Sequence, residues 1–211
     1  MQQILVYADS LSWGIVPGTR HRLPFEQRWP GVMEHALLAM DQHVRVIEDC
    51  LNGRRTVWED PFKPGRNGLL GLEQRIEVNS PLALVMLMLG TNDFQATHDN
   101  NAALVAQGIR ALILAIRRAP IEPGMPRPPI MVVAPPPVRT AKGTMAEKFA
   151  GAERRAVGLA AAIETVAGEQ ACSYFDAGTV TGTSDVDGVH LDAEQHRVLG
   201  EALAPSVNAL L

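Results

Sequence analysis

Val6-Tyr7-Ala8-Asp9-Ser10-Leu11-Ser12-Trp13-Gly14 is the stretch that decides the fold, because a serine follows the first apolar run, residues 4–7, after only two intervening residues. An apolar, partly β-branched run of this length predicts a buried strand. Open α/β folds bind their ligands at the carboxyl ends of the strands. The stretch therefore predicts a nucleophilic serine, Ser10, at that edge of a sheet. A serine after a strand also commonly caps a helix, here one starting near Leu11, and the stretch alone leaves both interpretations open.

A matching acid and base lie far along the chain, in Asp187-Gly188-Val189-His190. A serine hydroxyl is a weak nucleophile at neutral pH, so it needs a base within hydrogen-bond reach and a third group that orients the base. His190 and Asp187 are the residue types that these two roles require. The sequence thus favours a triad of Ser10, His190 and Asp187, which the fold has to bring together.

Four separated blocks of the chain resemble the SGNH (GDSL-type) hydrolase family. They are Ala8-Asp9-Ser10-Leu11, Asn52-Gly53, Gly90-Thr91-Asn92-Asp93 and Asp187-Gly188-Val189-His190. Four blocks in this order are specific, although any one of them arises easily by chance. Within the family, the chain is similar to the mycobacterial-type aryl esterase and acyltransferase group. Further segments that carry this second likeness are residues 10–14, 59–61, 89–93 and 134–137.

The resemblance implies a three-layer α/β/α fold with a five-stranded parallel sheet, the flavodoxin-like SGNH hydrolase fold. It implies a carboxylic ester hydrolase that works through an acyl-enzyme without a cofactor, with acyl transfer or perhydrolysis as an additional option. The predicted substrates are short-chain, acetyl-type esters, for the reason given in the next paragraph. Ser10 would be the nucleophile, His190 the base and Asp187 its orienting partner. Oxyanion donors would come from the N–H groups of Ser10 and Gly53 and from the Asn92 side chain.

We expect eight further residues, from these blocks and from the wall of a pocket, to contact the substrate. They are Asp9, Leu11, Trp13, Thr91, Phe94, Pro136, Phe149 and Val189. The aromatic members and the proline loop could wall a small pocket, which favours a short acyl group. The resemblance also implies a homo-oligomer, such as an octamer, whose channel is narrowed by the irregular excursion over residues 58–67.

One position departs from the family pattern, since Ala8 stands where the family usually has glycine. Alanine lacks the access to positive φ that glycine has. We expect a negative φ at Ala8, where alanine fits without penalty, because the other three blocks are intact. The non-enzymatic alternative, an inactive binding module, is supported by Ala8 alone. Other enzymatic alternatives are a carbohydrate acetylesterase and a thioesterase, which would use the same triad and which fold-level likeness cannot separate.

Composition limits the classes of partner. A chain of 211 residues, 46% hydrophobic and 20% charged, suits one domain over residues 1–211. The net charge of -4 and the absence of a Lys or Arg stripe argue against nucleic acid and anionic membrane surfaces and favour small neutral ester substrates. No apolar run approaches the ~20 residues of a membrane span. The lack of an export signal predicts a cytoplasmic protein. Cys50 and Cys172 are expected to be free thiols.

The sequence also argues against a metal site. Asp185 and Asp187 resemble the start of a calcium loop, but the twelfth position is His196 rather than glutamate. His190 and His196 lack the spacing of a zinc motif. No glycine-rich phosphate loop follows a strand, which excludes the nucleotide-binding α/β classes.

Alternating strands and helices predict a doubly wound parallel sheet. Strands are expected over residues 4–7, 43–48, 82–89, 130–133 and 173–176. Helices are expected over residues 30–40, 69–78, 102–118 and 145–167, and after Asp192, where Gln195 predicts a capping box.

Overall fold

The central sheet has five parallel strands in the order β2-β1-β3-β4-β5. The structure, a computed structural model, describes residues 1–211. The strands are β1 (Gln2–Ala8), β2 (Val44–Cys50), β3 (Leu84–Met88), β4 (Ile130–Ala134) and β5 (Ser173–Asp176). The predicted five-stranded parallel sheet is therefore confirmed.

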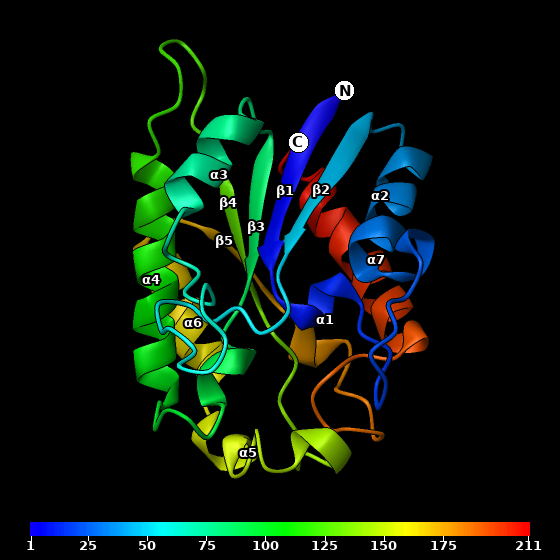
Figure 1. The fold of residues 1–211 in the computed structure, drawn as a ribbon. Helices are drawn as coiled ribbons and strands as arrows, with labels where there is room; N and C mark the ends of the chain where they lie inside the picture. Colours follow the sequence, from blue (N-terminus) through cyan, green and yellow to red (C-terminus); the bar gives the residue numbers. More distant parts are fainter.

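Helices cover both faces of this sheet (Figure 1). On one face α2 (Trp29–Ala39) packs against α7 (Ala193–Asn208), and on the other α4 (Ala102–Arg118) packs between α3 (Leu72–Asn79) and α6 (Leu159–Glu169). This is the expected α/β/α arrangement. The remaining helical segments are α1 (Ser10–Trp13), α5 (Ala152–Arg155) and the 3-10 turns η1 (Phe25–Gln27), η2 (Thr91–Phe94), η3 (Gly143–Met145) and η4 (Ala177–Thr179). None of the helices combines the length and the apolar character needed to cross a membrane.

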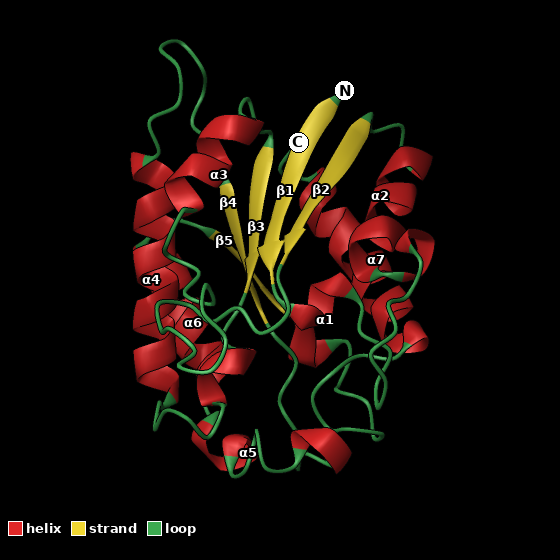
Figure 2. Cartoon of the chain, in the orientation of Figure 1, coloured by secondary structure: helices red, strands yellow, loops and turns green.

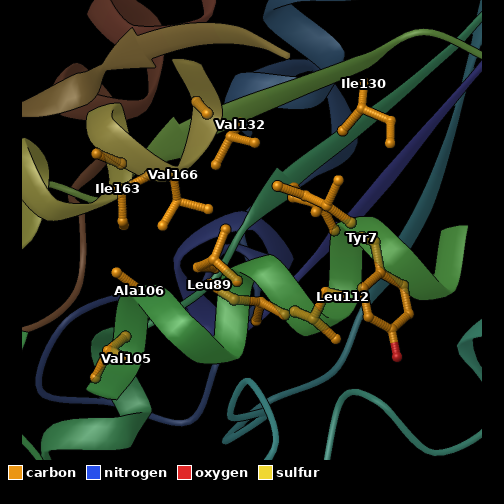
Figure 3. Packing of buried hydrophobic residues seen from close by; sticks show 14 of the residues in the cluster. Tyr7, Leu89, Val105, Ala106, Leu112, Ile130, Val132, Ile163 and Val166 are labelled. Atoms are coloured by element: carbon orange, nitrogen blue, oxygen red, sulfur yellow. The ribbon is translucent and has the colours of Figure 1, made fainter. Parts of the chain in front are cut away.

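The central strands are buried on both faces, which explains their continuous apolar sequences. Along β1, Ile4, Val6 and Ala8 pack into the cluster under α2 and α7. The alternating residues Leu5 and Tyr7 pack into the larger cluster under α3, α4 and α6, part of which is seen in Figure 3. Side chains that alternate between two cores fix the register of β1, because a slip by one residue would exchange the two faces.

The single helix expected over residues 145–167 is wrong. The chain instead forms η3, a series of turns, α5 and then α6. Gly151 and Gly158 precede α5 and α6 in the left-handed region, with φ of 72° and 84°. A left-handed residue interrupts an α-helix. The interruption leaves Phe149 on a turn beside the cavity over Ser10, which is described below.

The connections that matter for function gather beyond the carboxyl ends of the strands, where the loops are longest in Figure 2. α1 and α5 lie at this end of the sheet (Figure 1). The excursion expected over residues 58–67 forms no helix or extended strand and is joined to the body by a bridge between Arg55 and Asn67. Both cysteines are half-buried free thiols, as predicted.

Candidate active site

Ser10 is the first residue of α1 and follows β1 after a single intervening residue, Asp9. Asp9 is extended, with φ of -119°, and its Oδ1 accepts the Leu11 N–H at 2.9 Å. A helix therefore begins here, but Asp9 rather than Ser10 caps it, which leaves the Ser10 hydroxyl available for other contacts. Ala8 lies in β1 and is absent from the residues with positive φ, so the expectation that alanine fits at this position is confirmed.

The structure brings Ser10, His190 and Asp187 together at the carboxyl end of the sheet. His190 Nε2 lies 3.2 Å from Ser10 Oγ, and His190 Nδ1 lies 2.7 Å from Asp187 Oδ2. All three residues are buried. A hydrogen bond to Asp187 through Nδ1–H leaves Nε2 unprotonated in neutral His190, which is the form that can accept the serine proton.

Asp187 is held as an acceptor. Its Oδ1 accepts the Val189 and His190 backbone N–H groups, each at 2.9 Å. Burial alone would raise the pKa of Asp187, but the hydrogen bonds from the His190 ring and from these two amides outweigh it and lower the pKa to about 2. Asp187 is therefore a carboxylate throughout the neutral range, as a partner for a protonated imidazole must be.

Asn92 and Gly53 face the same cavity as the serine. Asn92 Nδ2 donates one N–H to Asp9 Oδ2 at 2.8 Å, and Asn92 Oδ1 accepts from Gln95 Nε2 at 2.7 Å. The second Asn92 N–H is left for a ligand. The Gly53 N–H donates no hydrogen bond within the protein, and its φ of 85° is a left-handed value that glycine adopts readily. Two donors are thus unoccupied beside Ser10.

Two buried carboxylates stand behind these donors. Burial raises the pKa of Asp9 to about 6 against the opposing hydrogen bonds from Leu11 and Asn92. Burial also raises the pKa of Asp93 to about 7, although the Thr56 hydroxyl and N–H both donate to it. Asp93 is fully buried and does not line the cavity, so it joins the third block to Thr56, on the loop that follows the second block, rather than facing a ligand.

The cavity over Ser10 is small, about 40 Å³. Its lining residues are Ser10, Ile15, Arg20, Asn52, Gly53, Lys63, Asn92, Met145, Lys148, Phe149 and His190. Of the residues expected to contact substrate, Phe149 lines this cavity. Thr91, Phe94 and Pro136 line a separate, more apolar cavity of about 340 Å³ next to α6.

The remaining expected contacts lie elsewhere. Leu11 packs in the core under α2 and α7, and Val189 packs in the opposite core. Trp13 is half-buried, and the Arg22 guanidinium carbon lies 4.7 Å from the centroid of its ring. Asp9 does not line the cavity, and its carboxylate accepts a hydrogen bond from Asn92. No group of three or more His, Cys, Asp or Glu side chains is placed to hold a metal ion.

Sequence reasoning missed Gln95 and Arg55. Gln95 orients Asn92, and the fully buried Arg55 donates to Gln95 Oε1 at 2.8 Å. Arg55 is in turn paired with Asp60 at 3.4 Å. Gln95 lies three positions after Asn92 on a predicted loop, and this short spacing is a signal that could have identified it as a hydrogen-bond partner of Asn92. Nothing in the local sequence shows that Arg55 is buried.

The sequence matches the GDSL-like Lipase/Acylhydrolase family over residues 9–198, which include Ser10, Asp187 and His190. The chain belongs to this family. As a GDSL-like hydrolase it is a carboxylic ester hydrolase with the α/β/α fold of its relatives.

Solved structures similar to this GDSL-like hydrolase span its full length. An inhibitor-bound aryl esterase of M. smegmatis is 33% identical, with a TM-score of 0.94 and coverage of 100% of both chains. A carbohydrate acetylesterase from Sinorhizobium meliloti is 32% identical, with a TM-score of 0.93 and the same coverage. A curated relative, an arylesterase of Vibrio mimicus, is 35% identical over 92 residues, which cover 44% of this chain and 38% of that protein.

Proposed function

We propose that the chain hydrolyses short-chain, acetyl-type esters through an acyl-enzyme formed on Ser10. The observation that carries this proposal is the hydrogen-bonded series from Ser10 Oγ to His190 Nε2 at 3.2 Å and from His190 Nδ1 to Asp187 Oδ2 at 2.7 Å. His190 would take the hydroxyl proton as Ser10 attacks the ester carbonyl, and would return it to the leaving alcohol. The lowered pKa of Asp187 supports its role in stabilising the imidazolium.

The negative charge of the tetrahedral intermediate would be received by three N–H groups. We assign these to the backbone of Ser10 and Gly53 and to the Asn92 side chain. The unoccupied N–H of Gly53 and the second N–H of Asn92 support the assignment, because both residues line the Ser10 cavity. Loss of one such donor typically lowers kcat by about 100- to 1000-fold.

Water would release the acyl group in hydrolysis, and an alcohol or a peroxide would release it in acyl transfer or perhydrolysis. A small cavity bounded by Phe149 and Met145 supports a short acyl group. Thr91, Phe94 and Pro136 line the second, more apolar cavity, and their contact with substrate stays a prediction. No cofactor enters this scheme.

Deacetylation of carbohydrates is the second candidate activity, and the likeness to the carbohydrate acetylesterase supports it. Thioester hydrolysis would use the same residues. The inactive binding module loses its one support, because Ala8 lies in β1 without a positive φ. A homo-oligomer and a cytoplasmic location stay predictions, and light scattering would test the first.

The experiment compares turnover of p-nitrophenyl acetate by the wild type and by Ser10→Ala, with and without a short alcohol. We expect an initial burst of p-nitrophenol from the wild type, an alkyl acetate when alcohol is present, and neither from the variant. Equal slow turnover by both proteins would refute the serine acyl-enzyme. A parallel assay with an acetylated sugar and an acetyl thioester ranks the alternative substrates.

A further inference from the structure

The wall of the Ser10 cavity has an unusual charge. Arg20, Lys63 and Lys148 line it, and no Asp or Glu does. The whole chain, in contrast, has a net charge of -4. The positive charge is therefore concentrated locally at the catalytic serine, where a low-dielectric wall focuses its field on a bound ligand.

The three cations come from unrelated parts of the chain. Arg20 lies between α1 and η1, Lys63 in the excursion over residues 58–67, and Lys148 on the turn between η3 and α5. All three are exposed at the rim, whereas Ser10 and His190 are buried. Three separate loops thus place their charges at one opening.

None of these three side chains has an ion pair or a side-chain hydrogen bond within the protein. Arginines elsewhere in the molecule are engaged, as with Arg28 on Glu48 at 2.6 Å and Arg54 on Asp49 at 2.6 Å. The acid whose charge acts on both rim lysines is Asp60. Its carboxylate is occupied by Arg55 and by the backbone N–H groups at positions 62 and 63.

The rim charges also repel one another. Although Lys148 is exposed at its surface, the protein around it removes part of its hydration and lowers its pKa; Asp60 opposes this, and the charges of Lys63, Arg55 and Arg20 lower the pKa further. The pKa of the exposed Lys63 is lowered by partial loss of hydration and by repulsion from Arg66 and Arg20, against the opposing charge of Asp60. Asp60 offsets this repulsion only in part, because its carboxylate is already held by Arg55, so a negatively charged ligand at this opening would relieve the remainder.

We propose that the substrates are anionic esters, in which the leaving alcohol bears a carboxylate or phosphate held by Arg20, Lys63 and Lys148. The inference rests on the esterase function proposed above and narrows its substrate class; it replaces the neutral substrate that composition favoured. The charge belongs on the alcohol portion because the cavity of about 40 Å³ at the serine leaves room for a small acyl group, whereas the cations stand at the exposed rim.

The test uses three acetate esters on one scaffold that differ in charge: para-acetoxybenzoate, its methyl ester, and para-acetoxyphenyltrimethylammonium. Each kcat/KM is divided by the rate of alkaline hydrolysis, which corrects for leaving-group reactivity. We expect the anion to exceed the neutral ester and the neutral ester to exceed the cation, chiefly through KM. Phenyl hemisuccinate, which carries its charge on the acyl side, should show no such advantage.

Charge substitutions identify the residues responsible. Replacement of Arg20, Lys63 or Lys148 by Gln should lower the anion-to-neutral ratio by about two- to fivefold each, as for exposed ion pairs. The control is Arg45→Gln, which removes an exposed cation near the opposite end of the sheet and should leave the ratio unchanged. Raising the ionic strength to about 0.15 M should shrink the ratio in the wild type without any mutation.

Each outcome decides between the two proposals. If Ser10→Ala abolishes turnover of the methyl ester but the anion has no advantage over it, the inference is overturned and the esterase function stands. If the advantage survives removal of all three cations, or is lost equally in Arg45→Gln, the inference is also overturned. If no ester is turned over in a Ser10-dependent way, the esterase function fails, and the anionic-ester inference with it.

Discussion

Gln95 Nε2 donates a hydrogen bond to Asn92 Oδ1 over 2.7 Å, so the side-chain amide of Asn92 has its orientation fixed by a neighbour on the same turn. Gln95 is itself oriented by Arg55, which can only donate, and Asn92 ends on Asp9, whose carboxylate accepts. The series Arg55, Gln95, Asn92 and Asp9 is therefore polarised in one direction. It directs the remaining Asn92 N–H toward the Ser10 cavity.

Gln95→Glu tests this positioning role. A glutamate would still pair with Arg55, but its second oxygen would face Asn92 Oδ1 and force the amide to turn. We expect kcat/KM for p-nitrophenyl acetate to fall by about 100-fold, as for the loss of one oxyanion donor, with affinity for a boronic acid inhibitor falling in parallel. Thr97→Val is the matched control, because it removes another acceptor of Arg55, at 2.8 Å, outside the series. Unchanged kcat/KM in Gln95→Glu would refute the role.

Gly108 determines how closely α4 approaches Thr56, on the loop that follows the second block. A Cβ added there would lie 2.1 Å from Thr56 Oγ1, the hydroxyl that donates to Asp93. Gly108→Ala should lower the free energy of unfolding by about 1–2 kcal/mol, because overpacking outweighs the helix-propensity gain. Gly168→Ala on α6, where a Cβ meets no atom within 4 Å, should raise it by about 0.5–1 kcal/mol. Urea denaturation measures both, and a stabilised Gly108→Ala would contradict the close packing.

His196 makes the fold sensitive to acid. It is fully buried in α7, and Nδ1 accepts the Trp29 N–H at 3.2 Å. Burial, with the charges of Arg28 and His190, lowers its pKa to about 3. The unfolded chain binds a proton near pH 6.5 and the folded chain does not, so stability is lost as the pH falls from about 6.5 toward 3.

His196→Gln keeps an acceptor for Trp29 but removes the titrating group. We expect its free energy of unfolding to fall less steeply with acid than that of the wild type, by up to about 1.4 kcal/mol per pH unit. His35→Gln, at an exposed position, is the control. Identical acid slopes for wild type and His196→Gln would show that His196 does not contribute.

We expect Phe149 and Met145 to limit the size of the acyl group. Both line the Ser10 cavity, Phe149 buried and Met145 half-buried. We expect p-nitrophenyl acetate to be preferred over the octanoate, and Met145→Ala or Phe149→Leu to shift relative kcat/KM toward longer chains by several-fold. Met145→Ala is the milder change, since the side chain is only partly buried. Faster turnover of octanoyl than acetyl esters by the wild type would contradict the proposal.

The sheet could be predicted because its strands are short, apolar and separated by helical patterns. α4 matched its expected bounds because a regular apolar stripe fixed it and Asn101 caps its first turn. The prediction of a single helix over residues 145–167 was wrong because this region has no such regular pattern. It is rich in alanine, which favours a helix, and a glycine within a helix lowers its stability only modestly. The sequence does not show that Gly151 and Gly158 adopt a left-handed conformation, which ends a helix.

Ser10, Asp187 and His190 could be chosen from the sequence because the chemistry of acyl transfer restricts the residue types. The residues that position and surround these three could not be predicted from the sequence. Arg55 is buried only because Asp60 and Gln95 meet it from other segments. The convergence of Arg20, Lys63 and Lys148 depends on three loops whose paths carry no periodic signal. Long-range placement, rather than local propensity, decides both features.

The contact between His190 and Ser10 joins residues 180 positions apart. Closing so long a loop costs conformational entropy that local structure alone cannot offset. Ester turnover therefore requires the intervening chain to be folded. The rate at which activity recovers after dilution from denaturant would measure the rate at which this long-range structure forms. Proteolytic cleavage between Ser10 and His190 followed by dissociation of either fragment would therefore abolish ester turnover, because neither fragment contains both residues.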